Sequence, residues 1–378
     1  MPKLKILRLE ELRDIVCIIV GTRPGIIKFS PIIKELIRRQ REFFILHTGQ
    51  HYSYNMDRLF FEELELPEPK YYIPGTHKEK YHGAQTAKML KGCEKAMLKE
   101  KPKLTLVGGD ANTNLAGALA ARKLHIYVGH VEAGLRSYDW RMPEEHNRVI
   151  IDHISDFLFA PTKKAKENLI KDGVRGKIFV TGNPIVDAVR QNIKVALRKS
   201  KILEKLNLRK EDYFLMTLHR EENVDVKENL VNILKGIRLI SSTYGLRIVF
   251  PMHPRTRDRI RRFNLIGYLK DIKELELIKP IGYLDFLLLL KNCKLVLTDS
   301  GGVQEESCIL KVPCVTLRDR TERPETVDVG ANHVAGVNPV SILKGIDIML
   351  NRKREWKNPF GERVSEKIVD IIERELDL

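Results

Sequence analysis

One pattern, repeated along the chain, constrains the fold of this sequence more than any other feature. A short apolar run, often rich in β-branched residues, is followed by glycine and polar residues, and then by a stretch with apolar residues at helical spacing. In the first half, the apolar runs lie at residues 14–20, 43–46, 104–107, 125–128, 157–159 and 178–180. Strands and helices that alternate through short glycine turns predict a parallel sheet with helices on both faces.

The pattern restarts at Tyr213, after a lysine- and leucine-rich helical stretch at residues 189–208. With 378 residues, the chain exceeds one average domain. We therefore expect two Rossmann-like α/β domains that face each other across a cleft. The expected boundaries are residues 1–186 for the first domain, 187–357 for the second and 358–378 for a C-terminal helix.

The first strand-to-helix turn carries two cations. Arg23 and Lys28 flank it, and both could reach an anionic ligand at the end of the strand, although ordinary surface charges would give the same pattern. The helix that follows contains Pro31. Because proline has no backbone N–H, we expect the helix to kink there or to restart after Ser30.

Residues 298–306, Thr-Asp-Ser-Gly-Gly-Val-Gln-Glu-Glu, follow an apolar run and precede a helical pattern. Ser300, Gly301 and Gly302 would then present backbone N–H groups and a hydroxyl at a helix N-terminus, which suits a phosphate. Glu306, one turn further on, could accept hydrogen bonds from a ribose diol. The alternative is an ordinary turn in which Ser300 caps the helix.

Polar clusters follow nearly every expected strand, and ligands of open parallel sheets bind at that edge. A diphosphate site in one domain opposite carboxylates in the other indicates nucleotide-sugar chemistry. Desolvation in a closed cleft raises carboxylate pKa values toward neutrality, as general acid–base catalysis requires. Any one carboxylate could instead be a helix cap or an ion-pair partner of Arg136, Arg141 or Arg148. The candidate groups are Asp110, Glu132, Glu144 and Glu145 in the first half and His219, Arg318 and Arg323 in the second.

The net charge of +16 leaves open a nucleic-acid-binding protein as an alternative of another class. The densest basic cluster, residues 255–262, has no interleaved aromatic residue and no nucleic-acid-binding signature, so a solvated helix face explains it better. The chain also has only five glutamines beside abundant Lys, Glu and Arg. This bias is typical of hyperthermophilic proteins and accounts for many of the charges.

Metal and dinucleotide sites are disfavoured by their missing motifs. His47 with His51, or His125 with His130, could be read as ligand pairs, but no His-Glu-x-x-His or cysteine partner accompanies them. Nor does any expected strand precede a Gly-x-Gly-x-x-Gly fingerprint. The five cysteines show no Cys-x-x-Cys spacing, and we find no signal peptide and no apolar run long enough to span a membrane. We therefore expect a cytoplasmic protein without metal or cofactor.

The chain resembles the non-hydrolysing UDP-N-acetylglucosamine 2-epimerases in motifs that occur in the family's order. They are Gly21-Thr22-Arg23-Pro24, Thr48-Gly49-Gln50-His51, His130-Val131-Glu132-Ala133-Gly134-Leu135-Arg136, Pro143-Glu144-Glu145, Thr181-Gly182-Asn183-Pro184, Asp299-Ser300-Gly301-Gly302 and Thr321-Glu322-Arg323-Pro324-Glu325. The resemblance implies a glycosyltransferase-B-type fold, a homodimer, and a C-terminal helix that crosses back to the first domain.

The resemblance also implies roles for individual residues. The catalytic group would comprise Asp110, Glu132, Glu144 and His219. Contacts with UDP and the sugar would come from Arg23, Lys28, Arg148, His219, Phe286 beside the uracil, Ser300, Gly301, Gly302, Glu306 at the ribose, and Arg323. The implied reaction interconverts UDP-N-acetylglucosamine and UDP-N-acetylmannosamine. It removes the proton at C2 while UDP leaves C1, and then returns a proton to the other face of C2 as UDP adds back to 2-acetamidoglucal. The product would supply glycan or surface polysaccharide synthesis, and the alternatives within this fold are a glycosyltransferase or a hydrolysing epimerase.

A few positions depart from the family. Gly25 stands where the family usually has Glu, and Glu221 where a second Arg commonly follows Arg220. Bacterial members bind a second, activating substrate molecule, for which Gln50 and His253 match, with Arg220 or Lys88 as further candidates. Ser53 and Ala84 replace a longer amide and an arginine there. We therefore expect activation to be weaker than in the family, or absent.

Overall fold

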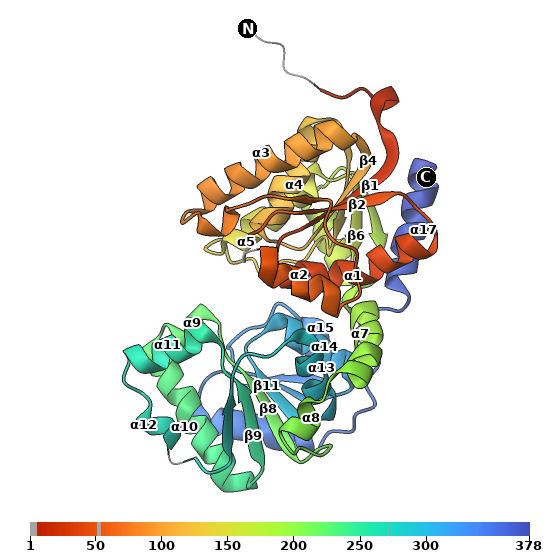
Figure 1. Cartoon of the computed structure of the whole chain (residues 1–378). Coiled ribbons are helices and arrows are strands. Elements are labelled where there is room, and N and C mark those ends of the chain that lie inside the picture. Colours follow the sequence, from red (N-terminus) through yellow and green to blue (C-terminus); the bar gives the residue numbers. More distant parts are fainter. Residues whose placement is uncertain (1–5, 51–53, 271) are drawn as a thin grey trace. The chain divides into compact units, whose positions relative to one another are not determined.

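The computed structural model describes residues 6–50, 54–270 and 272–378, which form two compact α/β units. One unit comprises the described residues up to Ala188 together with Phe360–Leu378, and the other comprises Val189–Pro359. Figure 1 shows that each unit is a sheet with helices around it. All strand pairs among the described residues are parallel, as the alternating pattern predicts.

The first unit has a seven-stranded sheet with the strand order β3-β2-β1-β4-β5-β6-β7. Its strands are β1 (Arg13–Val20), β2 (Phe43–His47), β3 (Tyr71–Tyr72), β4 (Pro102–Gly108), β5 (Tyr127–Val131), β6 (Phe157–Ala160) and β7 (Lys177–Val180). Its helices are η1 (Leu9–Glu11), α1 (Arg23–Arg38), α2 (Tyr54–Glu63), η2 (Thr76–Lys78), α3 (His82–Glu100), α4 (Asn112–Lys123), α5 (Pro143–Ile154), α6 (Lys163–Asp172) and α17 (Val364–Leu376). Helix α7 (Ile185–Lys199) starts in this unit and ends in the second.

The second unit has a six-stranded sheet with the strand order β10-β9-β8-β11-β12-β13. Its strands are β8 (Tyr213–Thr217), β9 (Arg247–Pro251), β10 (Leu275–Ile278), β11 (Leu295–Thr298), β12 (Cys314–Thr316) and β13 (Asn332–Val334). Its helices are α8 (Ile202–Lys205), α9 (Glu221–Val224), α10 (Lys227–Tyr244), α11 (Pro254–Arg262), α12 (Gly267–Lys270), α13 (Tyr283–Asn292), α14 (Gly301–Leu310), α15 (Pro324–Asp328) and α16 (Pro339–Leu350).

The cores follow from the period of two in the strands. In β1, Cys17 and Ile19 join a buried cluster with Met97 of α3, whereas Val16 lies on the other face beside Leu36 and Val369 of α1 and α17. The C-terminal helix α17 thus belongs to the first unit. Its acidic residues pair with Arg39, whose guanidinium nitrogens lie 2.6 Å from Glu373 and 2.7 Å from Asp370.

Both sheets reverse their strand order next to the first strand of the unit. The reversal lies between β1 and β4 in the first unit and between β8 and β11 in the second. The loops that leave two such strands diverge to opposite faces of the sheet and leave room for a ligand at the carboxyl ends. The strand order therefore predicts one ligand-binding position in each unit, at the carboxyl ends of these two strands.

The structure corrects several expectations about individual elements. Helix α1 continues through Pro31 and does not restart after Ser30. The helical stretch at residues 189–208 is two helices, α7 and α8, separated near Ser200. Strand β5 runs to Val131 and not to residue 128, so His130 lies inside the sheet. The sequence pattern missed the short strands β3 and β13, which have only two and three residues.

All five cysteines are buried and free. The part of the chain that the structure describes holds no helix that is both long and apolar enough to cross a bilayer.

Candidate active site

The candidate site of the first unit is built on the adjacent ends of β4 and β5. Gly108 is paired with Val131 in the sheet, and the Gly109 N–H donates to the Val131 carbonyl over 3.0 Å. Asp110 and Glu132 therefore leave the sheet side by side. Gly109 has φ +82°, and a Cβ there would lie 3.2 Å from a carboxylate oxygen of Glu132, so glycine permits the close approach of the two strand ends.

Glu132 combines burial with an unusual backbone. It is 3% exposed and has φ +68°, which a residue with a Cβ rarely adopts and which costs conformational energy. Its carboxylate is held by Lys28 Nζ at 2.5 Å and by the Asn183 amide at 2.8 Å. Lys28 comes from α1, Asn183 follows β7 and Glu132 itself follows β5. Three separate parts of the unit therefore meet at this carboxylate.

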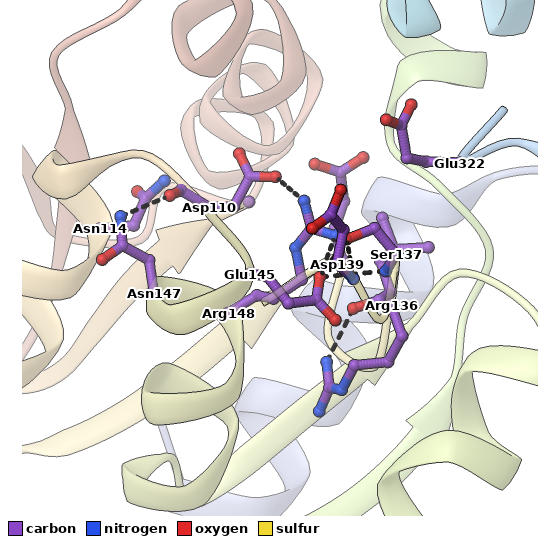
Figure 2. A network of polar contacts seen from close by, with 12 residues as sticks. Asp110, Asn114, Arg136, Ser137, Asp139, Glu145, Asn147, Arg148 and Glu322 are labelled. Atoms are coloured by element: carbon purple, nitrogen blue, oxygen red, sulfur yellow. Dashed lines mark hydrogen bonds and ion pairs between the residues drawn. The ribbon is translucent and has the colours of Figure 1, made fainter. Parts of the chain in front are cut away.

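Asp110 has a different environment. Its side chain is 43% exposed, and one carboxylate oxygen lies 2.5 Å from an Arg148 guanidinium nitrogen (Figure 2). The other Nη of Arg148 lies 2.7 Å from the buried carboxylate of Glu145. Arg148, which the resemblance predicts to contact the substrate, therefore also neutralises Asp110. Of the three predicted catalytic carboxylates, Asp110 and Glu132 therefore lie next to a cation.

The two glutamates at the start of α5 have separate environments. Glu145 accepts hydrogen bonds from the backbone N–H groups of Ser137 and Tyr138, and so it holds the loop that follows β5. Glu144, the predicted catalytic residue, is half-buried on the first turn of the helix. For Glu145 the alternative of an ion pair with Arg148 is confirmed. The sequence could not separate it from Glu144, because a Pro-Glu-Glu motif does not reveal which side chain turns inward.

Other predicted residues of the first unit lie near these strand ends. Arg23 starts α1 and stands over the Phe60 ring at 5.8 Å from its centroid. The side-chain oxygen of Gln50 accepts from the Thr113 N–H at 2.9 Å and from its hydroxyl at 2.7 Å. His51 and Ser53 lie outside the described residues.

The candidate site of the second unit is the N-terminus of α14. The helix begins at Gly301, and the Ser300 side chain makes no capping hydrogen bond. The alternative explanation of Ser300 as an ordinary cap is therefore not supported. Gly302 is exposed in the first turn. The first turn of a helix has backbone N–H groups without intrahelical partners, so this end presents donors suited to an anion.

Asp299, which sequence reasoning did not select as a site residue, joins the two loops at the strand reversal. It is fully buried and accepts from the N–H groups of His219 at 2.9 Å and Arg220 at 2.8 Å. Burial raises the pKa of Asp299, but hydrogen bonds and charge from His219 and the backbone N–H groups outweigh burial and lower it. The contact places His219 next to the start of α14.

The other predicted residues of this unit also lie around α14. Arg323 Nε lies 2.5 Å from the buried Glu305, and the buried Glu306 interacts with the Tyr283 hydroxyl. Phe286 is half-buried on α13. The His253 ring centroid lies 5.5 Å from that of His219, and burial, followed by the charge of His219, lowers the pKa of His253.

Two of the four histidines that could have been metal ligands, His47 and His130, have other partners. His47 is stacked on Tyr72 and its Nδ1 accepts from the Gly49 N–H at 3.0 Å, while burial lowers its pKa to about 4. His130 binds Asp152 and a backbone carbonyl. Within residues 6–50, 54–270 and 272–378, no group of three or more His, Cys, Asp or Glu side chains could hold a metal ion.

The basic cluster on α11 is partly neutralised. Arg255 and Arg259 both bind Asp225, at 2.5 Å and 2.7 Å, and Arg255 also binds Glu221 at 2.7 Å. These ion pairs hold α11 against the loop that follows β8, and they leave less unpaired positive charge for a polyanion than the sequence indicates.

Comparisons with known proteins agree with this geometry. The model of the family described as UDP-N-acetylglucosamine 2-epimerase matches residues 34–373. The UDP-N-acetylglucosamine 2-epimerase of Methanocaldococcus jannaschii is 57% identical, over 94% of this chain and 98% of the relative. The UDP-2,3-diacetamido-2,3-dideoxy-D-glucuronate 2-epimerase of Pseudomonas aeruginosa is 43% identical, over 84% and 87%.

A solved structure of the M. jannaschii UDP-GlcNAc 2-epimerase, in complex with UDP-GlcNAc and UDP, superimposes with a TM-score of 0.87. The two chains are 56% identical, and the match covers 95% of this chain and 99% of that one. The predicted fold class, two Rossmann-like units of the glycosyltransferase-B type, is confirmed. The chain belongs to the UDP-N-acetylglucosamine 2-epimerase family.

Proposed function

We propose that this protein interconverts UDP-N-acetylglucosamine and UDP-N-acetylmannosamine. The observation that carries the proposal is the pair of carboxylates at adjacent strand ends, Asp110 and Glu132, each beside a cation, in a chain of this family. Epimerisation at C2 needs a base for a weakly acidic C–H bond and an acid for the opposite face of the same carbon. Two carboxylates that each have their own partners suit these two roles, and Glu144, in the first turn of α5, is the third candidate.

The second unit would bind the UDP part of the substrate. The first turn of α14, with Ser300, Gly301 and Gly302, offers N–H donors for the diphosphate. Arg323 adds positive charge, and His219 adds a hydrogen-bonding ring. Glu306 would accept the ribose hydroxyls, and Phe286 would lie beside the uracil. These donors would stabilise UDP as a leaving group and hold it for return to the sugar.

The reaction would proceed by elimination and re-addition. A carboxylate takes the C2 proton, the C2–H electron pair forms the C1=C2 double bond, and the C1–O bond breaks so that UDP leaves with its electron pair. UDP then adds to C1 of 2-acetamidoglucal while an acid protonates C2 from the other face. Lys28 and Arg148 would hold the carboxylates in place through both steps.

One observation favours a second substrate. The P. aeruginosa relative is named for a 2,3-diacetamido glucuronate, whose sugar carries a carboxylate at C6. The higher identity to the M. jannaschii protein favours UDP-N-acetylglucosamine for this chain. We expect kcat/KM to be higher for UDP-N-acetylglucosamine. A higher kcat/KM for the diacetamido glucuronate in the same assay would assign the protein to that substrate.

Proton NMR of reactions started from each UDP sugar tests the proposed activity. We expect both reactions to reach the same mixture of the two sugars without loss of nucleotide. A hydrolysing epimerase would accumulate free UDP and N-acetylmannosamine, and a glycosyltransferase would stay inactive until an acceptor is added. The remaining alternative is a nucleic-acid-binding protein, and measuring nucleic-acid binding at increasing UDP concentrations tests it. A dedicated nucleic-acid-binding protein would keep salt-sensitive binding when UDP is saturating.

The homodimer, the cytoplasmic location and the supply of N-acetylmannosamine units to glycan synthesis are part of the proposal through the family resemblance. Light scattering of the purified chain tests the first of these, with the mass of two chains as the expected result.

A further inference from the structure

In the turn that carries Asp110, three successive backbone carbonyl oxygens accept hydrogen bonds from side chains. Asn114 Nδ2 donates to the Gly108 carbonyl at 2.6 Å, His130 Nε2 to the Gly109 carbonyl at 3.1 Å, and Asn147 Nδ2 to the Asp110 carbonyl at 2.9 Å. The three donors come from α4, β5 and α5. Gly108 is buried and Gly109 and Asp110 are half-buried, so side-chain donors replace water at these carbonyls and fix the path of the turn.

His130 differs from the two asparagines because each nitrogen of its fully buried ring has a hydrogen-bond partner. Its Nδ1 lies 2.6 Å from the Asp152 carboxylate, which also accepts from the Gly134 N–H at 3.1 Å and lies 2.7 Å from Arg136. The Asp152 carboxylate and the Gly109 carbonyl both accept hydrogen bonds, so each lies opposite a ring nitrogen that can carry a proton. Asp152 thereby fixes the orientation in which Nε2 reaches Gly109.

The position of Gly109 matters for the two carboxylates. Gly109 lies against the Glu132 carboxylate and immediately precedes Asp110. A shift of this turn would therefore change the separation of Asp110 from Glu132. Gly108 is already held by the ladder between β4 and β5, and Asn147 divides its amide between Asp110 and Asn112. Among the residues that the structure describes, His130 is the one side chain that reaches the Gly109 carbonyl.

We propose that His130 is a positioning residue for the epimerisation: oriented by Asp152, it holds the Gly109 carbonyl and so sets the placement of Asp110 beside Glu132. The proposal rests on the proposed function. It adds a buried histidine that does not touch the substrate. It predicts that His130 acts through its bond to the Gly109 carbonyl, while the bond to Asp152 only orients the ring.

Two substitutions at His130 each keep a different one of its hydrogen bonds, to the Gly109 carbonyl or to Asp152. In His130→Gln the side-chain amide nitrogen can take the place of Nε2 and keep the bond to the Gly109 carbonyl. In His130→Asn the shorter amide takes the place of Nδ1 and keeps only the bond to Asp152. Asp152 keeps Arg136 and Gly134 in both variants. The readouts are kcat and KM for epimerisation, UDP affinity by calorimetry, and thermal unfolding, each beside the unsubstituted protein.

A misplaced catalytic group costs about 10²-fold in rate, so we expect kcat of His130→Asn to fall about that much and kcat of His130→Gln by less than about tenfold. UDP affinity should be unchanged in both, because neither substitution alters a residue proposed to contact UDP. Equal losses in both folded variants, or an active His130→Asn, would overturn the proposal. If His130→Asn does not fold, a large loss of kcat in folded His130→Gln still overturns it. Absence of epimerisation in the unsubstituted protein would instead overturn the proposed function, and this inference with it.

Discussion

Glu132 shows what a sequence motif can and cannot convey about one residue. The motif identified Glu132 as a carboxylate at a strand end. It could not indicate the left-handed backbone, the burial or the lysine at 2.5 Å, because these depend on α1 and on the loop after β7. Asp299 was missed for a related reason. Its neighbours in the sequence point to phosphate binding, while its partners are backbone N–H groups about eighty positions away.

Asp110→Asn should remove turnover while leaving UDP binding nearly intact. Loss of a general acid or base costs about 10²–10⁴-fold in kcat. The amide oxygen can still accept from Arg148, so the fold should persist. Kinetics and calorimetry measure the two effects, and Asp14→Asn, on the exposed start of β1, is the matched control that should keep full activity. A loss of UDP affinity as large as the loss of kcat would count against this role.

Glu322 provides a pH-dependent test in the second unit. Burial raises its pKa, but the Arg318 ion pair outweighs burial, so the pKa falls from 4.5 to about 2. The carboxylate therefore stabilises the fold above pH 4.5, and this stability is lost as the pH falls toward 2. At pH 7, Glu322→Gln should lower the free energy of unfolding by at most about 3 kcal/mol, and the difference should shrink at pH 3.

Trp356 is buried in this unit, so its fluorescence in a Trp140→Phe background can follow urea unfolding of the second unit. Glu204→Gln, at an exposed position of α8, should change stability at neither pH. A difference between Glu322→Gln and the parent that is the same at pH 7 and pH 3 would show that the ion pair is not the source of the stability.

At the scale of elements, one side-chain hydrogen bond in α1 replaces the backbone hydrogen bond that a proline cannot make. Pro31 cannot donate to the Ile27 carbonyl four residues earlier, which is the reason to expect a break. The buried Ser30 hydroxyl donates to that carbonyl instead, at 2.8 Å. The helix therefore runs without interruption from Arg23 to Arg38. A pattern of apolar residues does not show such compensation, so the sequence could not exclude the restart after Ser30 that the structure lacks.

Ser30→Ala should leave the Ile27 carbonyl buried without a donor and destabilise the protein by about 1–3 kcal/mol. Ser242 is the control, since its hydroxyl makes the same kind of bond to the Leu239 carbonyl at 3.0 Å but on an exposed face of α10. Ser242→Ala should change the free energy of unfolding by less than about 0.5 kcal/mol. Urea unfolding followed by circular dichroism compares them, and equal effects would refute the compensation.

At the scale of the whole molecule, the alternation of strands and helices was enough to predict two parallel α/β units, because parallel strands need crossover helices. The shortest strands, β3 and β13, were missed because two or three residues carry no period. The candidate site was predicted as residues on strand ends. Its ion pairs were not, since they form between elements whose packing the sequence does not display.

Activation by a second substrate molecule is predicted to be weak or absent. Lys88, which could have replaced the missing arginine, binds Glu79 at 3.1 Å and the Gly75 carbonyl at 3.1 Å. The oxygen of Gln50 is occupied by Thr113. A missing charged contact weakens binding by roughly one to two powers of ten. The reaction from UDP-N-acetylmannosamine alone should show no lag. A lag that trace UDP-N-acetylglucosamine abolishes would show that Arg220, His253 or other residues rebuild the site.

Hydrogen exchange at C2 tests the central claim most directly. UDP-N-acetylglucosamine is incubated with the protein in deuterated water, and the sugars are analysed by mass spectrometry and proton NMR. Elimination and re-addition predict one deuterium at C2 of both UDP sugars with the nucleotide intact, and Asp110→Asn should reduce this incorporation together with turnover. Conversion between the two sugars with hydrogen retained at C2, or no exchange by folded protein that binds UDP, would contradict the account.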